Sequence, residues 1–96
     1  MRHKAWILTS VSVGDAAAFA EYRSAVAAVN AKLGGEMLIR GTVADILAGE
    51  GDRGEVIVAL GFADQDEARR YIASPEYAAL EPLRQQAGVF TIRLVA

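Results

Sequence analysis

The sequence predicts an α+β domain whose elements follow one another in the order β-α-β-β-α-β. Two observations lead to this prediction. Segments rich in β-branched, aromatic and aliphatic residues alternate with longer segments of helical periodicity. Glycines, prolines and capping residues stand at nearly every boundary between them. With 96 residues, the chain is expected to form a single domain, residues 1–96, around one core.

The first half of the chain predicts a strand followed by a long helix. Residues 4–13 form the expected strand, and Asp15 is placed to cap the helix that follows. Eight alanines over residues 16–33 favour the helix. Its large apolar residues recur on one face: Phe19, Tyr22, Val26, Val29 and Leu33. Two consecutive glycines, Gly34 and Gly35, then end it.

The middle of the chain predicts a β-hairpin. Residues 36–41 form a second strand, with residues 42–47 as a continuation after a bend at Gly41. Glycines separated by charged residues then form a polar loop. Residues 55–62 form a third strand that is almost entirely apolar.

A broken helix is expected after the hairpin. Asp64 and Glu67 have the spacing of a capping box at its start. The helix should stop at Ser74, because Pro75 disfavours the α conformation in the residue before it. Ser74 can then cap a new helix that Pro75 begins and that runs to about residue 87. A last strand over residues 89–95 completes the chain.

This order is that of a ferredoxin-like fold, in which the helices cover one face of a four-stranded antiparallel sheet. The other face of such a sheet is usually polar. Here the third strand is apolar on both faces, because Val58 and Leu60 alternate with Ile57 and Ala59. The chain is also 53% hydrophobic, which is high for so small a domain. We therefore expect the second face to pack against another copy of the chain in a homodimer.

Composition and charge exclude several classes of function. Ten basic and twelve acidic residues give a net charge of −2, so no basic surface is expected for a nucleic-acid partner. No apolar run is long enough to cross a membrane. Because cysteine is absent and His3 is the only histidine, neither a metal site nor a disulfide is expected. The sequence predicts a cytoplasmic protein without metal or cofactor.

A set of residues spread over positions 13–87 resembles domain-of-unknown-function family 1330. The matching residues are Tyr22, Gly34-Gly35, Arg40-Gly41, Phe62, Ala68, Ser74-Pro75-Glu76-Tyr77 and Arg84. The resemblance implies a ferredoxin-like domain of the dimeric α/β-barrel superfamily, in which two sheets close into a barrel. It implies no activity.

The chain departs from the family at two positions. Members often carry an acidic residue before the glycine that follows the second strand and before the phenylalanine that ends the third. This chain has Ala48 and Gly61 there. If those carboxylates serve catalysis in relatives, this chain lacks both, unless Glu50 replaces one of them.

Tyr22 and Arg40 are the first candidates for a ligand-binding site. Tyr22 lies on the inward face of the first helix, either as a core residue with a polar tip or with its hydroxyl in a pocket between helix and sheet. Arg40 lies within an apolar strand, where a charge is unusual unless it is paired. It either forms an ion pair with a helix carboxylate or holds the carboxylate of a ligand.

Tyr77 and Arg84 are the second pair of candidates. They are seven residues apart, so on a continuous helix they would point the same way. They could line the mouth of the pocket. The structural alternative, which we favour, is that they attach the short helix to the body of the domain, or to the partner subunit, through stacking and a salt bridge.

Two functions are consistent with these residues. The chain either binds a small acidic or aromatic molecule between sheet and helices, or is a cofactor-independent enzyme, similar to the monooxygenases and isomerases of the same superfamily. The missing acidic residues favour binding, whereas the superfamily favours catalysis.

Overall fold

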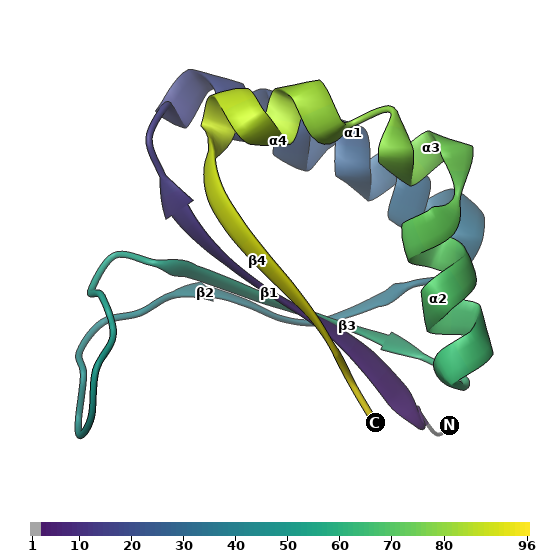
Figure 1. Ribbon diagram of the computed structural model, residues 1–96, viewed down its shortest axis with the longest axis horizontal. Coiled ribbons are helices and arrows are strands. Elements are labelled where there is room, and N and C mark those ends of the chain that lie inside the picture. Colours follow the sequence, from purple (N-terminus) through teal and green to yellow (C-terminus); the bar gives the residue numbers. More distant parts are fainter. Residues whose placement is uncertain (1–2) are drawn as a thin grey trace.

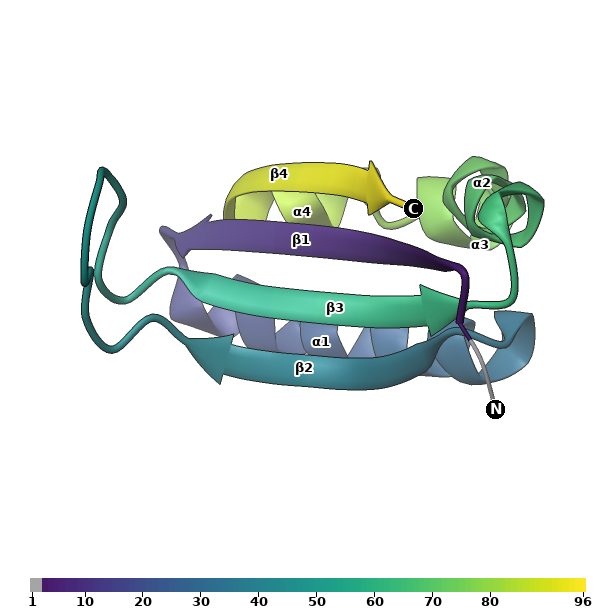
Figure 2. The same ribbon diagram turned by 90° about the horizontal axis from the view of Figure 1, so that it is seen from below.

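The computed structural model describes residues 3–96 and has the predicted order of elements. Its strands are β1 (Ala5–Val13), β2 (Glu36–Thr42), β3 (Val56–Phe62) and β4 (Gly88–Val95). Its helices are α1 (Ala16–Leu33), α2 (Gln65–Ala73), α3 (Pro75–Ala78) and α4 (Glu81–Ala87). The strands pair antiparallel in the order β2-β3-β1-β4. All helices lie on one face of this sheet (Figures 1 and 2), which confirms the ferredoxin-like fold.

The predicted caps begin and end the helices. Asp15 accepts a hydrogen bond from the Ala18 backbone N–H at 3.0 Å, and Gly34 ends α1 in the left-handed conformation with φ 85°. Asp64 accepts from the Glu67 N–H at 2.8 Å, while the Glu67 carboxylate accepts from the Ala63 N–H at 3.2 Å. Local side chains therefore satisfy the donors that a helix start leaves free.

The break at Ser74 is confirmed, but the helix after it is shorter than predicted. The Ser74 hydroxyl donates to the Tyr71 carbonyl at 2.7 Å and accepts from the Tyr77 N–H at 3.1 Å. Instead of one helix to residue 87, the chain forms α3 and then α4. The prediction overlooked Pro82, which lacks an N–H and whose ring would clash with the carbonyl of residue 78 in a continuous helix. The chain therefore turns at residues 79–80 and begins a new helix.

The hairpin also differs from its prediction. The strand was predicted to continue over residues 42–47 after a bend at Gly41. Instead, β2 ends at Thr42. Two backbone hydrogen bonds join Val43 to Glu55 and to Gly54, after which the loop projects beyond the sheet (Figure 1). The boundaries of the other three strands differ from prediction by one residue at most.

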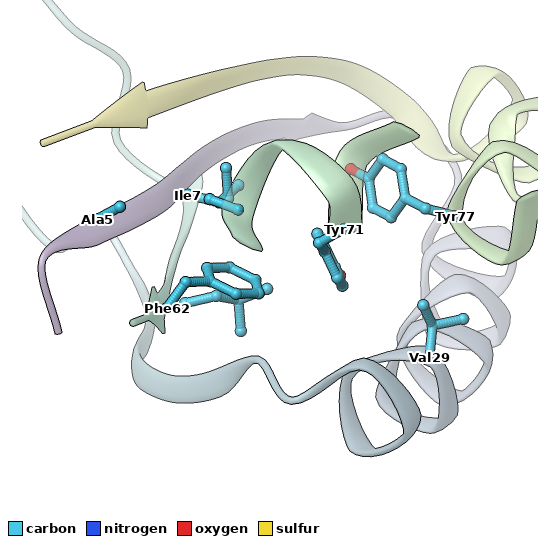
Figure 3. Packing of buried hydrophobic residues seen from close by; sticks show 8 residues of the cluster. Ala5, Ile7, Val29, Phe62, Tyr71 and Tyr77 are labelled. Atoms are coloured by element: carbon cyan, nitrogen blue, oxygen red, sulfur yellow. The ribbon is translucent and has the colours of Figure 1, made fainter. Parts of the chain in front are cut away.

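Two clusters of buried side chains form the core rather than one. The first joins β1 and β3 to α2 and α3, and it includes Ile7, Phe62, Tyr71 and Tyr77 (Figure 3). The second joins the other end of β1 to the start of α1 and the end of α4. Its members are Val11, Ala18, Phe19, Tyr22 and Ala87.

The face of the sheet opposite the helices is partly apolar and uncovered (Figure 2). Ile39, Val89 and Val95 lie on this face and are 56%, 71% and 42% exposed. Trp6, Leu8 and Ile57 lie on the same face and are half-buried. Apolar side chains therefore occupy both faces of the sheet, as the alternation in the third strand predicted.

Gly88 lies at the corner where α4 ends and β4 begins. A substitution at this position tests how closely the backbone packs there. A Cβ atom at Gly88 would overlap the Ser12 backbone oxygen. We expect Gly88→Ala to lower the free energy of unfolding by about 1–3 kcal/mol, because backbone atoms must move to admit the methyl group. Chemical denaturation measures the change.

Gly14 is the matched control in the same corner. A Cβ there would lie 3.9 Å from the Ala87 oxygen, which is an ordinary contact. Gly14→Ala is expected to leave stability nearly unchanged. Equal effects of the two substitutions would show that the close approach at Gly88 is not the cause.

Candidate functional site

A cavity of about 80 Å³ lies between α1 and the sheet. Its lining draws on both core clusters, so the cavity occupies the space between them. Strand side chains form the apolar floor: Ile7, Val11, Val56, Val58 and Leu60. Phe19, Tyr22 and Val26 of α1 lie opposite, and Tyr77 and Phe90 line it as well. Such a space, largely apolar with few polar groups, is typical of a small-molecule site.

Three of the four candidate residues line this cavity, and the fourth supports one of them. Tyr22, Arg40 and Tyr77 are all part of the lining. Arg84 lies outside, with its guanidinium carbon 4.3 Å from the centre of the Tyr77 ring. Its Nη1 also donates to the Tyr77 carbonyl at 3.2 Å. Arg84 thus stacks on Tyr77 and contacts α3, as the structural alternative predicted, but the salt bridge that it also predicted is absent from residues 3–96. A role for any of the four in binding remains a prediction.

A β-bulge brings Arg40 to the cavity. Met37 pairs with Leu60 and Ile39 with Ala59, so β2 carries one extra residue between these pairs. In a regular strand, residues 37 and 40 would point to opposite faces, because they are an odd number apart. The extra residue returns Arg40 to the face of Met37, and both line the cavity. Sequence periodicity alone could not have shown this.

Arg40 has no ion-pair partner among residues 3–96. The salt bridges in that part of the chain join His3 to Glu36 and Lys32 to Glu76, each at 2.8 Å. The predicted alternative, an ion pair with a helix carboxylate, is therefore absent from the described residues. The guanidinium is exposed at the edge of the cavity.

Aromatic contacts hold the Tyr22 ring in place. It lies 5.1 Å from the Phe90 ring, edge to face, and 6.4 Å from the Phe19 ring. The side chain is buried, and its hydroxyl lies within hydrogen-bonding reach of the Tyr77 hydroxyl. Both residues line the cavity.

Asn30 and Tyr71 form a buried polar pair that the sequence predictions missed. The Tyr71 hydroxyl donates to Asn30 Oδ1 in a short hydrogen bond, and both residues line the cavity. Asn30 lies eight positions after Tyr22, on the inward face of α1. That spacing was the available signal, but asparagine does not stand out in a search for apolar periodicity.

Burial keeps the tyrosines near the cavity neutral. It raises the pKa of Tyr71 well above its ordinary value of 10.0; the nearby Tyr22 adds to this, and the Arg84 charge opposes it. The pKa of Tyr77 is raised as well, first by burial and then by Tyr22. At neutral pH these hydroxyls can donate hydrogen bonds but cannot serve as strong bases.

The acidic candidates lie away from the cavity. Within residues 3–96 no aspartate, glutamate or histidine contributes to its lining. Glu50 lies in the projecting loop (Figure 1) and does not line the cavity. A Cβ at Gly61 would meet the His3 ring at 2.6 Å, so His3 occupies the place of a side chain there. No helix in the described chain is long and apolar enough to span a membrane.

Comparison with known proteins identifies the fold and the family. The family model for DUF1330, a domain of unknown function, matches residues 4–96. SnoaB, a cofactor-independent oxygenase from Streptomyces nogalater, is similar in structure with a TM-score of 0.71 and 17% sequence identity. That alignment covers 99% of this chain and 93% of SnoaB.

Two further structures share the fold. A protein of unknown function from Rhodopseudomonas palustris has a TM-score of 0.70 and 19% identity, over 98% of this chain and 82% of the other. A NIPSNAP domain protein from Burkholderia xenovorans has a TM-score of 0.64 and 10% identity, over 96% and 90%. No curated protein matches the chain.

The raised pKa values of Tyr71 and Tyr77 predict how stability depends on pH. Unfolded tyrosines ionise near pH 10, whereas these two stay protonated in the folded state. The free energy of unfolding should therefore fall above pH 10, by about 1.4 kcal/mol per pH unit for each tyrosine. Chemical denaturation between pH 8.5 and about 11 measures the slope. Tyr71→Phe should make it shallower; an unchanged slope would contradict the assignment.

Proposed function

The chain belongs to domain-of-unknown-function family 1330, and we propose that it binds a small organic molecule, acidic or aromatic, between sheet and helices. One observation carries this proposal: the cavity has an apolar floor, and the Arg40 guanidinium at its edge has no ion-pair partner within the described chain. The Tyr22 hydroxyl also lines the cavity, beside Tyr77. Polar groups that are not satisfied internally are suited to a ligand or to water.

The size of the cavity limits the ligand. A core cavity of about 150 Å³ is enough to enclose benzene. The cavity here measures about 80 Å³, so it encloses part of one ring. The rest of the molecule must lie in the mouth, which Arg40 borders. A single-ring compound, or a short conjugated acid, fits this description.

We further propose that the chain is a homodimer through the uncovered face of its sheet. Ile39, Val89 and Val95 would leave water when two sheets pack face to face. Exposed apolar patches of this kind mark association surfaces in soluble proteins. The absence of cysteine suits a reducing compartment, and the cytoplasm is the location that we propose.

Catalysis is the alternative function. SnoaB shares the fold and is a cofactor-independent oxygenase. Among residues 3–96, however, the cavity lining includes no carboxylate or imidazole that could act as a base. We therefore place binding first. Oxygen consumption in the presence of a bound compound would favour the alternative.

A screen of small carboxylates and phenols by thermal shift tests the binding proposal. A compound that binds only the folded state, at about one hundred times its Kd, stabilises that state by about 2.7 kcal/mol. We expect Ala27→Leu to abolish this stabilisation, because Ala27 is exposed on α1 and lines the cavity. Ala28→Leu, on the same helix but outside the lining, is the control and should keep it. Equal shifts in both variants would place the site elsewhere.

Size-exclusion chromatography with light scattering tests the dimer. The wild-type protein should have about twice the 10.2 kDa mass of one chain. The double variant Ile39→Glu, Val89→Glu should be monomeric, because it places charges on the face that must be desolvated. Ala20→Glu, exposed on α1, is the control and should remain dimeric. A monomeric wild-type protein would refute the proposal.

A further inference from the structure

The cavity has the opposite charge from the protein as a whole. The chain carries twelve acidic and ten basic residues. Arg23 and Arg40 both line the cavity, and within residues 3–96 no acidic residue does. The acids of the folded body have other roles: Asp15 and Asp64 cap helices. Glu36 and Glu76 form ion pairs elsewhere. An anion that enters the cavity would therefore meet two cations and no carboxylate.

The buried polar pair presents a donor to the cavity. Tyr71 is buried and neutral, and its hydroxyl uses Asn30 Oδ1 as acceptor. The Asn30 side-chain nitrogen remains, and it has no acceptor among residues 3–96. Asn30 is only 8% exposed. Every fully buried side-chain nitrogen in this part of the chain has a hydrogen-bond partner, so the Asn30 nitrogen is not fully buried. The amide nitrogen therefore borders the cavity, where it can donate to an oxygen of a ligand.

The arginines differ from Asn30 in their position. Arg23 and Arg40 are exposed, and Arg23 lies over the Phe19 ring at 5.8 Å from its centre. They therefore belong to the mouth, whereas buried Asn30 belongs to the interior. Aromatic side chains line the cavity as well, including Tyr22 and Phe90. Flat rings such as these favour an unsaturated, planar ligand.

We propose that the cavity selects a planar aromatic acid with its carboxylate at Arg23 and Arg40 and a ring oxygen at Asn30. This inference rests on the proposed binding function and makes it specific. A carboxylate accepts charge-assisted hydrogen bonds from guanidinium groups, which are stronger than bonds between neutral groups. The oxygen that meets Asn30 must be an acceptor, such as a hydroxyl or carbonyl oxygen.

Calorimetry with three compounds tests the proposal. 4-Hydroxybenzoate has the carboxylate and the ring oxygen, 4-hydroxybenzamide replaces the carboxylate by a neutral amide, and benzoate lacks the ring oxygen. We expect 4-hydroxybenzoate to bind at least about tenfold more tightly than the amide, as a charge-assisted hydrogen bond predicts. Its affinity should fall with rising salt, because the mouth is open to solvent.

Two variants assign the selectivity to residues. Arg40→Gln should remove most of the preference for the acid over the amide, because it weakens the acid more than the amide. Arg70→Gln, an exposed arginine of α2 outside the cavity, makes the same change in net charge and should preserve the preference. Asn30→Asp keeps the acceptor for Tyr71 and replaces the donor by an oxygen. It should weaken 4-hydroxybenzoate more than benzoate, with denaturation confirming that the variant is folded.

The outcomes separate the two proposals. Equal binding of the acid and the amide to the wild-type protein would overturn this inference and leave the binding function standing. The same holds if Arg40→Gln has no more effect than Arg70→Gln. Failure of all three compounds to bind would also overturn this inference, whereas the binding function falls only if the thermal-shift screen of carboxylates and phenols finds no ligand.

Discussion

Tyr71 connects four elements that surround the cavity. Its ring packs against Phe62 of β3 and Tyr77 of α3, with ring centres 5.1 and 5.0 Å away. Its hydroxyl donates to Asn30 of α1. An exposed ion pair between Lys32 of α1 and Glu76 of α3 adds a second polar link, and such pairs contribute little to stability. Tyr71 therefore provides the buried polar contact that holds α1 to α2, beside the apolar packing of Val29 in the same cluster.

The same hydrogen bond places polar atoms where the two core clusters meet. Asn30 puts a polar group on the inward face of α1, beside the apolar floor that Val58 and Leu60 form. A buried amide needs a partner for each of its polar atoms. Tyr71 satisfies the oxygen, so complete apolar packing around Asn30 would leave the nitrogen unsatisfied.

The charged residues that line the cavity are basic, whereas the chain as a whole has a net negative charge. The bulge in β2 brings Arg40 to the helix-covered face, and Arg23 reaches the same space from α1. Acidic side chains of the folded body stand at helix starts and in exposed ion pairs. A site can therefore be electropositive in an acidic protein, because net charge reports a sum and recognition depends on local charges.

Local patterns in the sequence determined most of the fold. The caps at Asp15 and Asp64 and the break at Ser74 depend on neighbouring residues only, and all three could be predicted. The helix break at Pro82 was equally local and was overlooked. The family could also be predicted, because its residues are spread along the chain in a recognisable order.

The tertiary structure decided how the candidate residues combine. Tyr22, Arg40 and Tyr77 come from three different elements, so only folding shows that they line one cavity while Arg84 supports it from outside. The direction of Arg40 depends on one extra residue in a strand, and strand alternation cannot reveal such a residue. The donor at Asn30 depends on a hydrogen bond to a residue 41 positions away. Periodicity describes which face a residue occupies, whereas long-range contacts decide which groups meet there.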